Sequence, residues 1–276
     1  MDQIISGRFA PLRFQLWPRD SFRIVNWNIE RGLRFNRVVE FLKACKADLI
    51  LLQEVDLNAR RTHHLDVARE IAQSLQMNYV FAREFQELTQ GSRTSPAYHG
   101  QATLSPWPLS NPRILRFQKQ SNFWRPHWFL PEVSPFQERT GGRLALVVEV
   151  SVAGNVTITY NLHLESRGED ELRGSQLNET FEDARRYDSD MPILLAGDLN
   201  IDMSTGPAAT AISEARFQDA FANQHVTTRP AHSFLGHGRI IDWIFTRGPI
   251  RSSQPQVHRS VNASDHFPLS INLTFA

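Results

Sequence analysis

Residues 191–200 set the narrowest limits on the fold. The first six of them, Met-Pro-Ile-Leu-Leu-Ala, form a short apolar run of the kind that is typical of a buried strand. Gly197 ends the run and allows the backbone to turn tightly or to approach a ligand closely. Asp198 and Asn200 are two residues apart, so an extended backbone points both side chains to the same side. An Asx turn after a strand is the structural alternative.

The composition is that of an ordinary globular chain. Of its 276 residues, 41% are hydrophobic and 21% are charged, and a chain of this length can bury a substantial core. With a formal net charge of +1, we expect no overall positive field that would attract nucleic acid. A local basic groove remains compatible with this charge. The single cysteine, Cys45, excludes an intramolecular disulfide framework and a Cys-rich metal site.

We expect neither a membrane span nor a leader from the sequence. No uninterrupted apolar stretch is long enough to cross a bilayer. The first residues lack a basic segment followed by a long apolar core, so we expect no signal peptide. The sequence therefore predicts a cytoplasmic protein. We expect a monomer, and no protein partner can be inferred.

The first third of the chain alternates strands with helices. A strand is expected at 22–30, a buried strand at 47–55 and a further strand at 79–82. Apolar residues at three- and four-residue spacing predict helices after the first two strands, around 35–45 and 65–75. This order is typical of an α/β fold. Residues 1–20 show no clear period, and we expect a surface arm there, before a single domain at 21–276.

The rest of the chain repeats this alternation after an irregular middle. Polar, turn-rich residues at 84–100 and a proline-interrupted aromatic segment at 118–138 predict loops. The remaining pattern predicts a strand at 100–105, a hairpin of strands 143–152 and 156–162, helices at 169–187 and 207–215, and strands at 192–197, 239–245 and 267–273.

Polar side chains recur where the expected strands end. Each has an ordinary structural explanation when it is considered alone: a local backbone hydrogen bond, a cap, a core histidine or a buried partner for an arginine. Burying so many polar groups is nevertheless costly unless they serve one another or a ligand. The set comprises Asn28, Glu30, Glu54, Asn161, His163, Asp198, Asn200, Asp242, Asp265 and His266.

Phosphoester hydrolysis is the chemistry that these residue types suit. Carboxylates such as those of Glu30 and Glu54 bind a hard cation, and Mg²⁺ needs only one or two of them. Asn and His side chains donate hydrogen bonds to oxygens on which charge builds, and a His fixed by an Asp acts as acid or base near neutral pH. The sequence contains no phosphate-binding loop, no His-Glu-x-x-His and no Gly-x-Ser-x-Gly motif.

Six motifs in order resemble the endonuclease/exonuclease/phosphatase superfamily, also called deoxyribonuclease-I-like. They span nearly the whole chain. The resemblance implies a four-layer α/β/β/α sandwich, in which two mixed, mostly antiparallel sheets pack face to face with helices outside. The motifs are Trp27-Asn28-Ile29-Glu30, Leu52-Gln53-Glu54-Val55, Asn161-Leu162-His163-Leu164, Gly197-Asp198-Leu199-Asn200, Ile241-Asp242-Trp243-Ile244 and Ser264-Asp265-His266-Phe267-Pro268-Leu269.

The resemblance implies a metal site and a substrate site. Glu54 corresponds to the principal Mg²⁺ ligand, Glu30 to a second acidic residue that assists it, and Asp265 would lie near the metal. Mn²⁺ is a possible substitute. Asn28 is assigned to positioning the metal or the phosphate, and Asn161 to supporting substrate binding from behind.

The resemblance also implies catalytic roles. Asp198 would orient the attacking water, and Asn200 would bind a phosphate oxygen. His266 would contact the phosphate or transfer a proton, oriented by Asp242, and His163 would stabilise the charged transition state. Two positions depart from the family pattern, because Gln101 stands where Asn is frequent and Trp243 where Tyr is frequent.

The bond type is better defined than the substrate. The main prediction is a Mg²⁺-dependent phosphodiester hydrolase acting on nucleic acid, as a nuclease or a DNA-adduct phosphodiesterase. The alternatives are a hydrolase of phospholipid, sphingomyelin or small phosphoesters, which would make membrane lipid the partner, and a catalytically dead binding relative. Residues 162–167 resemble the tyrosyl-DNA phosphodiesterase and sphingomyelinase branches. The aromatic residues Phe123, Trp124, Trp128 and Phe129 are expected to stack on bases, enter a lipid interface or form a small core.

Overall fold

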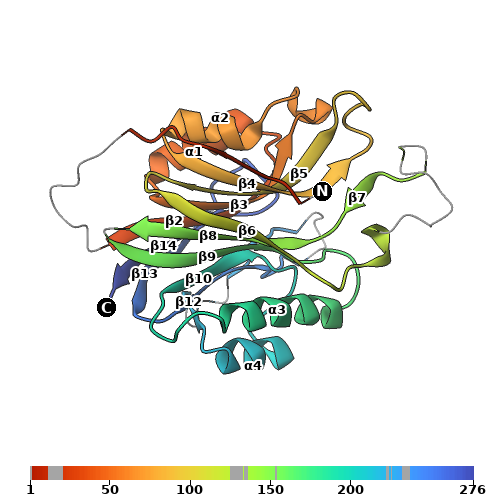
Figure 1. The fold of residues 1–276 in the computed structure, drawn as a ribbon. Coiled ribbons are helices and arrows are strands. Elements are labelled where there is room, and N and C mark those ends of the chain that lie inside the picture. The colour runs from red at the N-terminus through yellow and green to blue at the C-terminus, as the bar shows by residue number, and fades with distance from the viewer. Residues whose placement is uncertain are drawn as a thin grey trace.

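Two β-sheets stack face to face between two pairs of helices (Figure 1). The computed structural model describes residues 2–11, 21–124, 133, 136–152, 154–221, 224, 226–231 and 237–276. Helices α1 (Phe35–Cys45) and α2 (Val67–Leu75) cover one sheet, and α3 (Asp170–Ala184) and α4 (Gly206–Glu214) cover the other. The expected four-layer sandwich of two mixed sheets is confirmed.

The first sheet has one parallel pair in an otherwise antiparallel arrangement. Its parallel strands β2 and β3 are joined by α1, as a parallel connection requires. The order is β1 (Ile4–Gly7), β4 (Asn78–Glu87), β5 (Ala97–Ser105), β3 (Leu49–Leu57), β2 (Ser21–Arg31), β14 (Leu269–Phe275) and β13 (Ile250–Val257), and β7 (Arg139–Gly141) pairs with β4.

The second sheet is built in the same way. Its single parallel pair, β9 and β10, is joined by α3, and the other pairs are antiparallel. The order is β11 (Gln218–Asp219), β12 (Asp242–Arg247), β10 (Ile193–Asp198), β9 (Asn155–His163), β8 (Leu144–Val152) and β6 (Leu109–Arg116). Short 3₁₀ helices η1 (Arg60–Thr62) and η2 (Asn122–Trp124) lie in the connections.

Alternate side chains along each strand point to opposite faces of its sheet, so one set packs between the two sheets and the other packs against the helices. On β2, Phe22 and Ile24 join the apolar core between the two sheets, whereas Val25 and Trp27 pack beneath α1 and α2. On β10, Leu194 faces the other sheet and Leu195 faces α3 and α4. Both faces of each central strand are therefore buried, which explains their continuous apolar sequence.

The sequence patterns did not predict several strand segments. Strand β1 lies within the expected N-terminal arm, where it pairs with β4, while residues 12–20 fall outside the described residues. Strands β4 and β5 extend into the two ends of region 84–100, where a loop was expected. The sequence pattern did not predict these extensions because the buried polar residues Glu84, Glu87 and His99 interrupt the apolar alternation. Across the described part of the chain, no helix is long and apolar enough to cross a membrane.

A buried polar bridge joins the two sheets next to their strand ends. The side-chain amide of Asn161 on β9 donates to the carbonyls of Leu52, at 3.1 Å, and Ala102, at 2.9 Å, in the opposite sheet. Its oxygen accepts a hydrogen bond of 2.7 Å from Gln53. Gln101 makes a similar link, because its amide donates to the carbonyl of Leu144 at 2.9 Å.

Replacing Asn161 with Ala is expected to destabilise the fold by about 2–4 kcal/mol, because two buried carbonyls and the Gln53 amide each lose one hydrogen bond. Urea unfolding measures the effect. Asn178→Ala, at an exposed position of α3, serves as the control and should unfold near the wild-type midpoint. Equal midpoints for the two variants would contradict the bridging role of Asn161.

Candidate active site

Strand register brings three predicted catalytic side chains into one row. Asp198 ends β10, where it is paired with His163 on the parallel strand β9 and with Asp242 on the antiparallel strand β12. All three side chains are buried. Because directly paired residues in neighbouring strands project on the same face, the row is a consequence of the backbone pairing.

Asp198 is the centre of the site. Its Oδ2 accepts a hydrogen bond of 3.0 Å from the Asn28 amide in the opposite sheet, and its Oδ1 accepts one of 3.0 Å from the backbone of Asn200. The Nε2 atoms of His163 and His266 each lie 3.7 Å from Oδ2. The structure therefore brings these five predicted residues together.

His266 is held by a second carboxylate. Its Nδ1 lies 2.8 Å and 3.0 Å from the two carboxylate oxygens of Asp242. Burial alone would lower the pKa of His266. The charges of Asp242 and Asp198 and the hydrogen bond with Asp242 outweigh burial and raise this pKa to about 9. The imidazole is consequently positively charged near neutral pH.

Glu54 belongs to the same site. Its carboxylate lies 3.3 Å from Arg31 and is 19% exposed. Burial would raise the pKa of Glu54, but the positive charges of Arg31, His99, His163 and His266 hold it well below its usual range. The carboxylate is therefore ionised, and it shares its electrostatic surroundings with His266.

Irregular backbone aims the acidic side chains. Glu30, Glu54 and Asn200 have φ angles of 47°, 50° and 53°, in the left-handed region that non-glycine residues seldom adopt. Around Glu54, the register of β3 shifts both in its pairing with β2 and in its pairing with β5. Such bulges re-aim side chains and are frequent beside active sites.

The other predicted residues occupy the edge of the site or its support. Glu30 is half-buried and pairs with Arg34 at 2.8 Å, while its backbone amide donates to the Asn28 side chain. Asp265 precedes His266 and pairs with Arg229 at 2.9 Å. Asn161 is fully buried in the bridge between the sheets, on the strand that ends at His163.

The sequence did not reveal the buried ion pair beside His163. The Arg143 guanidinium lies 2.6 Å from Glu84 and 2.8 Å from Nδ1 of His163, and it donates to Ser166 at 3.0 Å. His99 lies close to Glu84 and His163, and its Nδ1 is 3.0 Å from a carboxylate oxygen of Asp56. A polar residue inside an apolar strand pattern was the only available signal for Glu84 and His99.

Two clusters have the residue types that hold divalent metals. Each brings three potential ligand atoms within 4.8 Å of one another. One is Asp198, Asp242 and His266, and the other is Glu84, His99 and His163. In the second cluster, Arg143 already provides a positive charge.

The aromatic segment is partly explained. Trp124 is buried, and its Nε1 donates to Glu165 at 2.6 Å, so it acts as core. Phe123 is half-buried, with the Arg167 guanidinium 3.9 Å above its ring. Trp128 and Phe129 lie outside the described residues. Trp243, which stands where the family frequently has Tyr, donates from its indole nitrogen to the carbonyl of Ile201 at 3.1 Å.

The chain belongs to the endonuclease/exonuclease/phosphatase family, whose sequence model matches residues 25–266. Enzymes of this family are generally phosphoester hydrolases that use divalent metals. No curated protein sequence matches the chain significantly.

Solved structures of several other proteins have the same fold. An endonuclease/exonuclease/phosphatase from Beutenbergia cavernae DSM 12333 is 19% identical, with a TM-score of 0.69 over 94% of this chain and 72% of that one. TDP2 from Caenorhabditis elegans is 20% identical, with a TM-score of 0.63 over 93% and 74%. A family member from Bacteroides vulgatus is 16% identical, with a TM-score of 0.66 over 94% and 100%. At these identities the comparison shows the fold alone.

The Glu84–Arg143 pair predicts a pH-dependent stability. Burial would raise the pKa of Glu84, but Arg143 and His163 lower it to about 2, below its ordinary value of 4.5. The ionised pair therefore stabilises the fold fully above pH 4.5, and this contribution is lost as the pH falls toward 2. Glu84→Gln is expected to cost about 3 kcal/mol at pH 7, with a smaller deficit at pH 3.

Urea unfolding at pH 7 and pH 3 tests this expectation. Glu182→Gln, which alters an exposed ion pair on α3, is the control and should cost little at either pH. A deficit for Glu84→Gln that stays constant between the two pH values would rule out the ionised pair as its source.

Proposed function

We propose that this protein is a Mg²⁺-dependent phosphodiester hydrolase that acts on nucleic acid, as a nuclease or a DNA-adduct phosphodiesterase. The observation that carries the proposal is the convergence of the carboxylate, amide and imidazole side chains at one end of the sandwich. Within this group, Asp198 contacts or closely approaches Asn28, Asn200, His163 and His266.

The acidic residues fit a hard divalent ion. Glu54 offers an ionised, partly exposed carboxylate, and we assign it as the principal ligand, with Glu30 and Asp265 assisting at the edge. Carboxylate oxygens are the ligands that Mg²⁺ prefers, and Mn²⁺ accepts the same set. When bound, such an ion polarises the phosphoryl group and neutralises charge on the leaving oxygen.

The remaining side chains supply proton transfer and hydrogen bonds. Asp198 is held in place by Asn28, and we assign it to orient the attacking water by accepting its hydrogen bond. His266, kept positive by Asp242, would donate to the phosphate and stabilise its growing charge. We assign His163 and Asn200 to the other phosphate oxygens.

Exposed arginines favour nucleic acid as the substrate. Segments at the same end of the sheets as Glu54 and Asp198 carry four exposed guanidinium groups, and none of them pairs with a carboxylate of the described residues. Guanidinium groups recognise phosphates through paired hydrogen bonds, and a row of them suits a polymer with a phosphate at every unit. The four are Arg60, Arg93, Arg167 and Arg239.

A lipid phosphodiester is the second candidate. Three of the exposed large apolar side chains, Leu33, Val133 and Phe136, are 45%, 44% and 56% exposed and lie in segments at the active-site end. Apolar side chains around a polar site are typical of enzymes that work at a membrane surface.

Replacing Glu54 with Gln is expected to lower turnover of bis-p-nitrophenyl phosphate about 100-fold or more and to raise the Mg²⁺ concentration needed for half-maximal rate. Steady-state assays across a Mg²⁺ titration measure both. Glu40→Gln, on the exposed face of α1, is the matched control and should behave as wild type. Unchanged turnover at limiting Mg²⁺ would refute the assignment of Glu54.

A substrate panel with Mg²⁺, Mn²⁺ or chelator decides between the two candidates. We expect cleavage of DNA or RNA oligonucleotides and none of sphingomyelin. Arg93→Gln, at an exposed position, should raise KM for an oligonucleotide several-fold and leave bis-p-nitrophenyl phosphate unaffected, since the small ester reaches no second phosphate site. Turnover of lipid without turnover of nucleic acid would reverse the ranking.

A further inference from the structure

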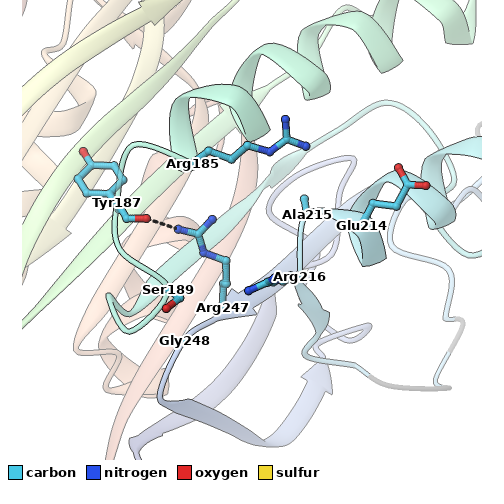
Figure 2. A pocket seen from close by; sticks show the side chains of 8 residues that line it. All are labelled: Arg185, Tyr187, Ser189, Glu214, Ala215, Arg216, Arg247 and Gly248. Carbon is cyan, nitrogen blue, oxygen red and sulfur yellow. Dashed lines mark hydrogen bonds between the residues drawn. The ribbon is translucent and has the colours of Figure 1, made fainter.

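A cavity of about 450 Å³ lies at the opposite end of the second sheet from the active site (Figure 2). Strand β12 connects the two places, because it begins with Asp242 in the active site and ends with Arg247 in the cavity. Five residue steps of extended strand separate Asp242 from Arg247 by about 17 Å. The cavity is therefore distinct from the site described above.

The cavity is lined mainly by positive charge. Three guanidinium groups, those of Arg185, Arg216 and Arg247, line it together with a single carboxylate, that of Glu214. Figure 2 shows Arg247 at its centre, with Glu214 on α4 some way to the side. Arg185 also pairs with Glu182 on the exposed surface of α3. Arg216 and Arg247 are thus the least neutralised of the three.

Arg247 is fixed but only partly satisfied. It donates to the carbonyls of Ala184, at 2.8 Å, and Tyr187, at 3.3 Å, near the end of α3. Its Nε is buried and has no hydrogen-bond partner among the described residues. Burial, opposed by Tyr160 and reinforced by the charge of Arg216, lowers the pKa of Arg247, and both arginines line the same cavity.

Arg216 completes the arrangement. It follows α4 with a φ angle of 61°, a left-handed conformation that turns the chain sharply next to the cavity. Its exposed guanidinium forms no hydrogen bond or ion pair with the described residues. Two like charges that line one cavity are unfavourable alone and favourable around an anion.

We propose that this cavity binds a phosphate-bearing anion between Arg216 and Arg247, with Arg185 at its edge. Guanidinium groups present paired N–H donors that match the oxygens of a phosphate. The Tyr187 hydroxyl points away from the cavity in Figure 2, so the arginines supply the recognition. The anion is either free inorganic phosphate or a phosphate of a nucleic acid backbone. The inference does not depend on the proposed hydrolase activity.

Isothermal titration calorimetry of the full chain in chelator tests the proposal. Inorganic phosphate is expected to bind wild type at one saturable site and to bind Arg216→Gln and Arg247→Gln about tenfold or more weakly. Arg69→Gln, at an exposed position of α2, removes the same charge elsewhere and should bind as wild type. A thymidine decamer without terminal phosphates forms the second arm.

The two arms separate the sources of the phosphate. Weaker binding of the decamer by both variants assigns the cavity to a nucleic acid backbone, and an effect on inorganic phosphate alone assigns it to the free ion. The Arg216 side chain is exposed and forms no hydrogen bond or ion pair with the described residues, so its variant remains informative if Arg247→Gln is unstable. Absent binding, or equal binding of phosphate by wild type and Arg216→Gln, would overturn the proposal.

Discussion

The buried carboxylate of Asp198 is the interaction on which the site depends. It sits at the end of β10 with almost no exposure, and its hydrogen bond from Asn28 comes from the opposite sheet. A charge in this position is tolerated only while its partners surround it. The two sheets must therefore pack together before Asp198, His163 and His266 can face one another, so the fold and the site form together.

The two sheets contribute different kinds of side chain to the candidate active site. The first sheet supplies acidic and amide groups at irregular strand ends, where Glu30 and Glu54 occupy left-handed backbone conformations. The second sheet supplies a regular row, set by the pairing of β10 with β9 and β12. Bulges in one sheet thus aim side chains at a fixed row in the other, and three of the residues with a left-handed backbone, Glu30, Glu54 and Asn200, belong to the predicted site.

Charge is also divided along the strands of the second sheet. At one end, carboxylates and imidazoles neutralise one another, as Asp242 and His266 do. At the other end, Arg216 and Arg247 stand together beside a single lining carboxylate. The first arrangement suits proton transfer, because opposite charges within it shift one another's pKa values. The second suits binding of an anion that brings its own charge.

The sequence alone determined the strand–helix alternation and the residue types at the strand ends, because periodicity and turn residues act locally. The six motifs also identified the family. Short strands such as β1 and β7 could not be predicted, since their stability comes from pairing with β4. The Glu84–Arg143 pair and the arginine cavity were likewise hidden, because their members are far apart in the chain. Only the tertiary structure decided these contacts, since strand register and sheet packing set the distances between side chains that the chain order leaves open.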